Sequence, residues 1–250
     1  LNMILIGIIG PIYSGKKTIA NFLKEKLKFE VLSINEYENK PKKLIQYVIK
    51  DLKKNYVIYG IDNDTLSALK EFRRRPFFLL LAVDAELNVR YQRRKYSGET
   101  SDEFNDFMKK NDENWGKIYE IMYMADFTIM NSSSKDDLYK CLKGLKLKSK
   151  DILRPDYDTY FMYLAELVAS RTNCIKRKVG CVLVKDSRVI ATGYNGTARG
   201  LKNCNDGNCK ECSQGESGGK SSTCLCLHAE ENALLEVGRE NKGCILYCNT

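Results

Sequence analysis

The chain has 250 residues, with 41 lysines and arginines against 32 aspartates and glutamates, a net charge of +9, and 43% hydrophobic residues. This composition is that of a globular protein of one large or two modest domains, and no apolar run is long enough to cross a bilayer. The start lacks the pattern of a signal peptide and the basic residues are interleaved with acids, so we expect a cytoplasmic protein whose partners are small anions rather than membranes or nucleic acid.

The first predicted element is a buried parallel strand in the apolar run Met3–Gly10. A loop bounded by glycines follows, and then a helical pattern over 19–27. Strand, loop and helix in this order favour a phosphate-binding loop, because backbone N–H groups and a helix N-terminus attract an anion. The candidate phosphate-binding residues are Gly10, Gly15, Lys16 and Thr18.

The loop departs from the usual phosphate-binding pattern at Lys17, which stands where a Ser or Thr hydroxyl normally holds Mg²⁺. Thr18 follows as an imperfect substitute. Metal positioning is central to phosphoryl transfer, so we expect a domain that binds a regulatory nucleotide, with Mg²⁺ as its accompanying ion, in preference to a kinase. A degenerate kinase-like scaffold that only packs against the rest of the chain remains an open alternative.

Further strands are predicted over 56–59, 77–83 and 127–130, with helical stretches between them. Strands that alternate with helices indicate an α/β domain with a parallel sheet and helices on both faces. The segment 77–85, followed by Arg90, Arg93 and Arg94, resembles nucleotide and dephospho-coenzyme A kinases, whose lid helix supplies arginines to phosphate. The resemblance implies a P-loop kinase-like domain over residues 1–147.

A lysine-rich segment over 143–150, followed by Arg154-Pro155, predicts the boundary to a second domain over 148–250. This domain is expected to hold a helix over 157–170, a hairpin with strands over 179–184 and 188–192, a short helix that begins at His228, and a last strand over 244–248. It is a second α/β unit.

A cysteine-rich loop over 197–226 lies between the hairpin and the short helix. With no secretion signal, such cysteines favour metal binding over disulfides. Cys209-x-x-Cys212 has the spacing of a zinc knuckle, and Cys224 with Cys226 closes a tetrahedral site, with Cys204 as an alternative to Cys226. Reduced thiols without a metal are the alternative.

The chain contains one histidine, in the segment His228-Ala-Glu230. His and Glu at this spacing form half of the zinc deaminase signature, in which the histidine binds zinc and the glutamate moves protons. At the first turn of a helix both side chains reach into one cleft. Taken alone, a histidine followed by acids is also typical of an ordinary helix start.

The surrounding segments strengthen the deaminase interpretation. Val179-Gly-Cys-Val-Leu-Val, Gly193-Tyr-Asn-Gly and Cys226-Leu-His-Ala-Glu-Glu-Asn-Ala-Leu resemble, in order and spacing, the cytidine deaminase-like superfamily and most closely its deoxycytidylate deaminases of fungal type. The resemblance implies an α/β/α domain that hydrolyses dCMP to dUMP with Zn²⁺. It also implies that His228 binds zinc, that Glu230 is the general acid and base, and that Asn195 contacts the sugar, although Asn195 also suits a simple turn.

In this family the two other zinc ligands come from a Pro-Cys-x-x-Cys directly after the last strand, whereas the sequence ends Cys248-Asn249-Thr250. Cys248 precedes the expected motif, so it takes no ligand role. We therefore expect an incomplete deaminase domain, a fragment that is inactive unless the missing segment is present. The resemblance further implies a homo-oligomer controlled by dCTP and dTTP.

Two other functions remain open from the sequence. One is a nucleotide or dephospho-coenzyme A kinase-like protein with a zinc-stabilised accessory domain. The other is a tRNA-editing deaminase, suggested by the basic charge and the shared His-x-Glu. Gly-Tyr-Asn-Gly together with Glu-Asn-Ala favours a free nucleotide as the substrate.

Overall fold

The computed structural model describes residues 3–37, 40–61, 66–98, 104–207, 225–238 and 242–250. The chain forms two compact units, Leu1–Arg154 and Pro155–Thr250, and each is described by itself. The division lies seven residues beyond the boundary expected at 147. The reason is that Leu147 is buried in the core of the first unit, and the partly buried Ile152 and Leu153 pack against that core.

The first unit is built on a parallel five-stranded sheet of order β2-β3-β1-β4-β5. The strands are β1 (Leu5–Ile9), β2 (Glu30–Ser33), β3 (Tyr56–Tyr59), β4 (Phe78–Asp84) and β5 (Phe127–Met130). The central strand β1 is buried along its whole length, as a continuous apolar run predicts. The predicted α/β class with a parallel sheet is confirmed.

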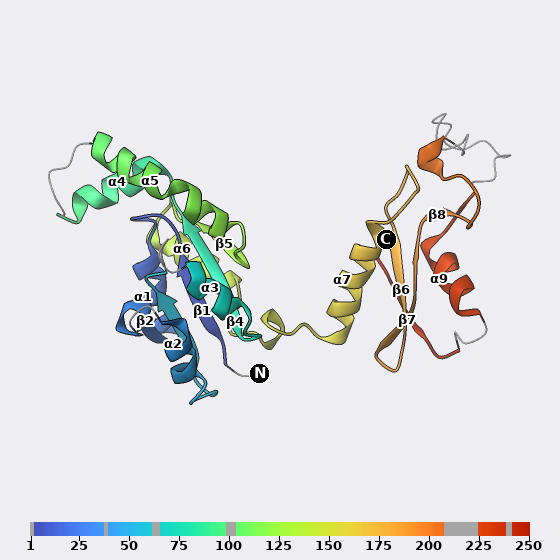
Figure 1. Cartoon of the computed structure of the whole chain (residues 1–250), viewed down its shortest axis with the longest axis horizontal. Coiled ribbons are helices and arrows are strands. Elements are labelled where there is room, and N and C mark those ends of the chain that lie inside the picture. The colour runs from blue at the N-terminus through green and yellow to red at the C-terminus, as the bar shows by residue number, and fades with distance from the viewer. Residues whose placement is uncertain (1–2, 38–39, 62–65, 99–103, 208–224, 239–241) are drawn as a thin grey trace. The chain divides into compact units, whose positions relative to one another are not determined.

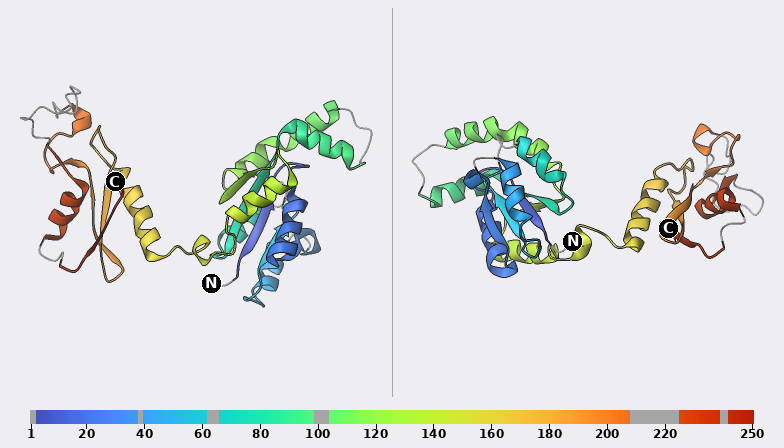
Figure 2. Two further views of the ribbon diagram at one scale, coloured as in Figure 1. Left: turned by 180° about the vertical axis from the view of Figure 1, so that it is seen from behind. Right: turned by 60° about the horizontal axis from the view of Figure 1, so that its bottom comes forward.

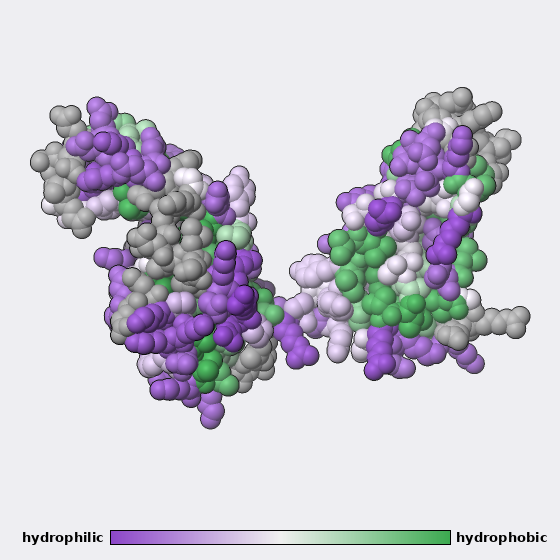
Figure 3. All heavy atoms as spheres, in the orientation of Figure 1, coloured by the Kyte–Doolittle hydropathy of each residue, from purple (hydrophilic) through white to green (hydrophobic). Residues whose placement is uncertain are grey.

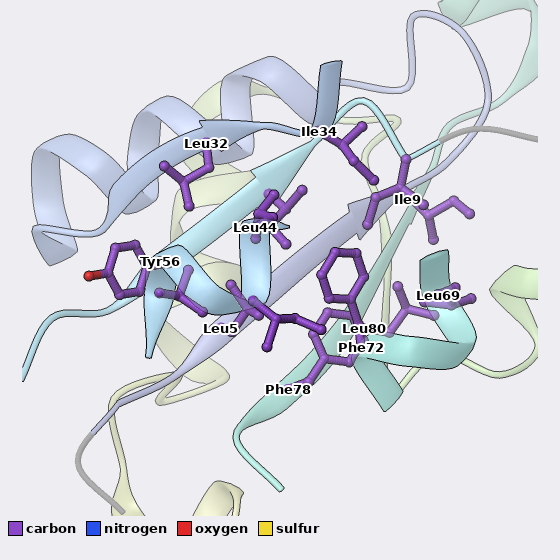
Figure 4. Close-up of a cluster of buried hydrophobic side chains, with 14 of the residues drawn as sticks. Leu5, Ile9, Leu32, Ile34, Leu44, Tyr56, Leu69, Phe72, Phe78 and Leu80 are labelled. Atoms are coloured by element: carbon purple, nitrogen blue, oxygen red, sulfur yellow. The ribbon is translucent and has the colours of Figure 1, made fainter. Parts of the chain in front are cut away.

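Helices cover both faces of this sheet (Figures 1 and 2). Apolar residues of α2, α3 and α5 pack on one face, and those of α1 and α6 on the other. Figure 4 shows the first of these two clusters, in which Leu5 and Ile9 of β1 lie among Leu44 of α2 and Phe72 of α3. The bounds are α1 (Lys16–Leu27), η1 (Ile34–Tyr37), α2 (Pro41–Val48), α3 (Leu66–Arg73), α4 (Leu87–Tyr96), α5 (Phe104–Met122), α6 (Lys135–Gly144) and η3 (Lys150–Ile152).

The second unit is an α/β/α sandwich around an antiparallel sheet of order β10-β6-β7. Helix α7 packs on one face and helix α9 on the other (Figure 2). The elements are α7 (Tyr157–Ala169), β6 (Gly180–Lys185), β7 (Arg188–Tyr194), β8 (Gly196–Thr197), η4 (Cys204–Asp206), β9 (Cys226–Leu227), α9 (Ala229–Val237) and β10 (Ile245–Cys248).

Two glycines allow both helices to lie close to this sheet. A Cβ atom on Gly180 of β6 would stand 2.3 Å from the carbonyl oxygen of Ala165 in α7. A Cβ atom on Gly193 of β7 would stand 2.1 Å from the carbonyl oxygen of Ala229 in α9. Any side chain at either position would push a helix outward, so these glycines set the thickness of the sandwich.

Where the sequence predicted bounds, the strands and α7 agree with the structure within two residues, whereas α1 begins at Lys16, three residues before the expected start. Helices α2 to α6 were expected only as helical stretches without bounds, and the short strands β2, β8 and β9 were missed. In the part of the chain that the structure describes, no helix is long and apolar enough to span a membrane.

Hydrophobic residues are exposed on the visible face of the second unit (Figure 3). Exposed apolar side chains of this unit include Ile245 and Leu246 on β10 and Leu167 on α7.

Candidate active site and phosphate loop

The candidate active site is built at the start of α9. The two-residue strands β8 and β9 pair antiparallel, with Gly196 opposite Leu227 and Thr197 opposite Cys226. This pairing fixes the chain directly before His228, which is the N-cap residue of α9 and is exposed. The histidine is therefore held at a defined place, with its imidazole accessible to a ligand.

Two asparagines tie the start of α9 to the end of β7. The side-chain oxygen of the buried Asn195 accepts a hydrogen bond from the backbone N–H of Ala229 at 3.0 Å. In return, the side-chain amide of Asn232 donates to the carbonyl oxygen of Tyr194 at 2.7 Å. These reciprocal contacts explain why the Gly-Tyr-Asn-Gly and His-Ala-Glu-Glu-Asn segments occur together.

The two adjacent glutamates of α9 have different partners. Glu231 accepts a hydrogen bond from the backbone N–H of His228 at 2.8 Å, so it caps the helix. The half-buried Glu230 instead accepts a hydrogen bond from the thiol of Cys248, with 3.2 Å between Sγ and Oε1. The structure thus leaves Glu230, not Glu231, available for chemistry beside His228.

Two cysteines on neighbouring strands lie close to Glu230. Burial, and then the hydrogen bond to Glu230, raises the pKa of Cys248 to about 12. Burial, and then the charge of Glu230, raises the pKa of Cys181 to about 11. Both thiols therefore keep their protons at neutral pH, so neither lies beside Glu230 as a thiolate.

The described residues supply part of a metal site. The imidazole of His228 is a good zinc donor, but no group of three or more His, Cys, Asp or Glu side chains that could hold a metal occurs in the described ranges. His228 is the residue that the sequence predicts as a ligand of the catalytic zinc. The donor type fits zinc, although the described side chains do not complete its coordination.

The cysteine-rich loop is described only at its two ends. There the Sγ atoms of Cys204 and Cys226 approach to 2.9 Å, although 22 residues separate them in sequence. This distance is longer than the roughly 2.0 Å of a disulfide bond. Cys209, Cys212 and Cys224 lie outside the described residues. The structure therefore brings the two alternative fourth ligands of the expected zinc site to the same place.

The predicted phosphate loop of the first unit lies between β1 and α1. Gly15 is the N-cap of α1 with φ of 107°, a conformation that favours glycine, and an added Cβ would meet the Asn131 side chain at 2.2 Å. At Gly10 an added Cβ would lie 1.9 Å from the Val83 carbonyl oxygen. Thr18 lies half-buried in the first turn of α1. Both glycines are therefore required by the close packing of the loop against β4 and the residue after β5.

Side-chain donors form hydrogen bonds with the carbonyl oxygens of this loop. Each carbonyl from Gly10 to Ser14 accepts a hydrogen bond from a side-chain nitrogen. The donors are Lys16 to Gly10 and Pro11, Arg90 to Ile12, Arg93 to Tyr13 and Asn131 to Ser14, at between 2.6 and 3.4 Å. With the carbonyls paired in this way, the N–H groups at the start of α1 are the loop groups suited to an anion.

The arginines of α4 are part of this support. Arg90 is 1% exposed, and burial lowers its pKa from the ordinary guanidinium value. It donates to the Ala85 carbonyl at 2.9 Å and to the Asn111 side chain at 2.8 Å. Arg93 also donates to the Asn131 carbonyl at 2.7 Å. In this arrangement two of the three predicted phosphate-contacting arginines, Arg90 and Arg93, support the loop itself.

A cavity of about 480 Å³ lies at the carboxyl end of β4, where residues of α4 and α5 line it. Asp84 lies in its wall, where it accepts a hydrogen bond from the Tyr119 hydroxyl at 2.7 Å. Burial, and then this bond to Asp84, raises the pKa of Tyr119 above its ordinary value. Sequence reasoning missed this pair, along with Asn131, Asn232 and Cys248, because no local pattern links residues that meet only through the fold.

Comparison with known proteins identifies relatives of this chain. Residues 155–250 match the model of the cytidine and deoxycytidylate deaminase zinc-binding region. A deoxycytidylate deaminase of Schizosaccharomyces pombe is 41% identical over 98% of this chain and 83% of its own length. A deoxycytidylate deaminase of Saccharomyces cerevisiae is 40% identical over 98% of this chain and 82% of its own. A crystal structure of the dCMP deaminase from cyanophage S-TIM5 with dCMP and dUMP aligns with 38% of this chain and 65% of its own, at 33% identity and a TM-score of 0.30.

Proposed function

Because the chain belongs to the deoxycytidylate deaminase family, we propose that it hydrolyses dCMP to dUMP and ammonia, a step in pyrimidine deoxynucleotide metabolism. The observation that carries the proposal is the start of α9, where His228 and Glu230 lie on either side of the Ala229 N–H that Asn195 fixes. A cytoplasmic location suits such a reaction.

The residues of this site have separate roles in the proposal. His228 is one ligand of a catalytic zinc. When bound, zinc lowers the pKa of water toward about 7, so that hydroxide is available at neutral pH. Glu230 takes a proton from the attacking water and delivers it to N3 of the base. It then takes the second proton, from the hydroxyl group added at C4, and gives it to the amino group, which leaves as ammonia while C4 becomes a carbonyl. The Asn195 amide nitrogen is the group left to contact the sugar, since its oxygen is bonded to Ala229.

The proposal is tested by Glu230→Gln in the protein expressed from its complete gene and loaded with zinc. Loss of general acid–base catalysis should lower kcat for dCMP by roughly 100- to 10 000-fold. The matched control is Glu236→Gln on the same helix, because Glu236 is exposed and, in the described part of the chain, forms an ion pair with Arg199 at 3.2 Å. Equal activity of Glu230→Gln and the wild type would remove Glu230 from the mechanism, and absence of dUMP formation by the wild type would overturn the proposed reaction.

A second zinc in the cysteine-rich loop is a separate part of the proposal. The nearness of Cys204 and Cys226 supports either thiol as the fourth ligand, with Cys209, Cys212 and Cys224 as the other three. The test is zinc content per chain by mass spectrometry. The double variant Cys204→Ser/Cys226→Ser should lose one equivalent, whereas Cys141→Ser, at an exposed cysteine of α6, should lose none. Equal zinc content in both variants would favour loop thiols without a metal.

The first unit suits a second function, nucleotide binding without phosphate transfer. The paired carbonyls from Gly10 to Ser14 support an anion at the start of α1, and Lys17 in place of a hydroxyl disfavours the Mg²⁺ arrangement of a kinase. Lys16→Met should weaken binding of ATP or dCTP in calorimetry, while Lys26→Met, at an exposed position of α1, should not. Phosphate transfer that Lys16→Met abolishes would instead favour the kinase alternative.

Control by deoxynucleoside triphosphates within a homo-oligomer completes the proposal, with dCTP as activator and dTTP as inhibitor. Sedimentation with and without each triphosphate measures the assembly. Kinetics with Lys16→Met then tells whether any response to effectors depends on the loop of the first unit. Deamination of dCMP with no activity on RNA would dismiss the tRNA-editing alternative.

A further inference from the structure

The thiol of Cys248 contacts the carboxyl group assigned to proton transfer. Cys248 is the last residue of β10, and Glu230 lies in the first turn of α9. Their side chains meet with 3.2 Å between Sγ and Oε1. No zinc ligand is expected at Cys248, so this contact has no explanation in metal binding.

The fold accounts for this meeting. Strand β10 pairs antiparallel with β6, in a register that places Cys248 opposite Cys181. Both cysteines belong to the cluster on the α9 face of the sheet, together with Ala229 and Ala233. Because Gly193 lets α9 lie close to the sheet, the first turn of the helix is brought within reach of the end of β10.

The direction of the hydrogen bond follows from the chemistry of the two groups. A thiol that keeps its proton at neutral pH is a donor, and a carboxylate only accepts. A thiol is also a weak donor, so it orients a carboxylate with less stabilisation of the charge than a hydroxyl or amide would give. One oxygen of Glu230 is thereby fixed, and within the described parts of the chain no hydrogen bond to the other is found.

We propose that Cys248 is a positioning residue for deamination, whose thiol holds Oε1 of Glu230 so that Oε2 faces the reacting groups. This inference rests on the proposed function. A glutamate has three rotatable side-chain bonds, and a proton carrier must lie within hydrogen-bond reach of its target. A fixed Oε1 reduces the number of rotamers from which proton transfer begins, so its loss should lower kcat more than it changes KM.

The contact itself is tested without any turnover, by Raman spectroscopy of the S–H stretching band. Isotope-edited difference spectra between wild type and Cys248→Ala isolate the band of this thiol. Glu230→Ala, which removes the acceptor, should shift that band to higher wavenumber, and Glu236→Ala should leave it in place. A Cys248 band that does not respond to Glu230→Ala would overturn the contact and the proposal with it.

The role of the contact is tested by kinetics on the zinc-loaded protein from the complete gene. Cys248→Ala should lower kcat for dCMP by roughly three- to tenfold with little change in KM, the effect of one modest hydrogen bond. Cys248→Ser should recover most of the rate, because a hydroxyl also donates. Cys181→Ala is the control, since it removes a neighbouring thiol of the same cluster without removing the bond to Oε1.

The outcomes separate this inference from the function on which it rests. Turnover by the wild type together with an unchanged kcat in Cys248→Ala would overturn the positioning role alone. Equal losses in Cys248→Ala and Cys181→Ala would also overturn it, because packing would then explain both. Absence of dCMP turnover by the wild type would overturn the proposed function and with it the catalytic role of the thiol.

Discussion

The side-chain oxygen of Asn195 accepts a hydrogen bond from the backbone N–H of Ala229 at 3.0 Å, and Asn195 is buried. Ala229 is the first residue of α9, so its N–H has no partner within the helix. The asparagine therefore supports the peptide between His228 and Glu230. This bond gives Asn195 a structural role in addition to the sugar contact that the sequence predicts.

The two roles of Asn195 are separated by two substitutions. Asn195→Ala leaves the buried N–H of Ala229 without a partner and should lower the free energy of unfolding by about 1–3 kcal/mol. Asn195→Asp keeps an acceptor at a helix start, where negative charge is favourable, but loses the amide donor. It should therefore keep its Tm and raise KM for dCMP. An unchanged Tm in Asn195→Ala would contradict the support of α9.

Gly193 should tolerate no larger residue. In Gly193→Ala the new Cβ would lie 2.1 Å from the Ala229 carbonyl oxygen and 2.5 Å from the Ala233 backbone nitrogen, so α9 has to move. We expect a loss of about 1–3 kcal/mol in thermal or denaturant unfolding, as for other overpacked sites. Gly196→Ala is the control, because its Cβ would come no closer than 3.4 Å to a neighbour. Similar stability of the two variants would mean that the sheet and helix adjust freely.

The sequence predicted the fold to the extent that each element carries its own pattern. The apolar runs at β1 and β4, and the hairpin of β6 and β7, are visible as continuous or paired strand signals. Strand β2 was missed because only its last two residues are buried, so its sequence, Glu-Val-Leu-Ser, has no clear alternation. Strands β8 and β9 are too short for any period and exist only through their mutual pairing.

The site was predictable only where its residues are close in sequence. His228 and Glu230 share one helical turn, so their spacing indicates their chemistry. Cys248 follows Glu230 by 18 residues, and Asn131 follows Ser14 by 117, so their hydrogen bonds depend on strand register and sheet order. Local sequence spacing contains no information on strand register or sheet order. The groups that orient the site are therefore visible only in the structure.

Asn131 should keep the backbone of the phosphate loop in one conformation. Its side-chain amide donates to the Ser14 carbonyl at 2.7 Å, the shortest bond to that oxygen, while Arg93 reaches it at 3.4 Å. Asn131→Ala should therefore speed amide hydrogen exchange at Gly15 and Lys16 and weaken nucleotide binding, with dCMP deamination unchanged. Asn105→Ala, at an exposed position of α5, is the control. Unaltered exchange at Gly15 would show that the arginines alone hold the loop.

The start of α7 should make the stability of the second unit depend on pH. Asp156 caps α7 by accepting a hydrogen bond from the backbone N–H of Thr159 at 2.8 Å, and this bond holds its pKa below the ordinary value. Because the folded pKa is lowered, the stabilisation is fully present above the ordinary pKa of about 4 and is lost as the pH falls through the folded pKa. The Tm difference between wild type and Asp156→Ala should thus be largest at neutral pH and shrink in acid. Asp156→Asn keeps a neutral cap, so the Tm difference between Asp156→Asn and Asp156→Ala should stay constant with pH in metal-free protein. If the Tm difference between wild type and Asp156→Ala does not shrink in acid, the carboxylate charge contributes nothing to the cap.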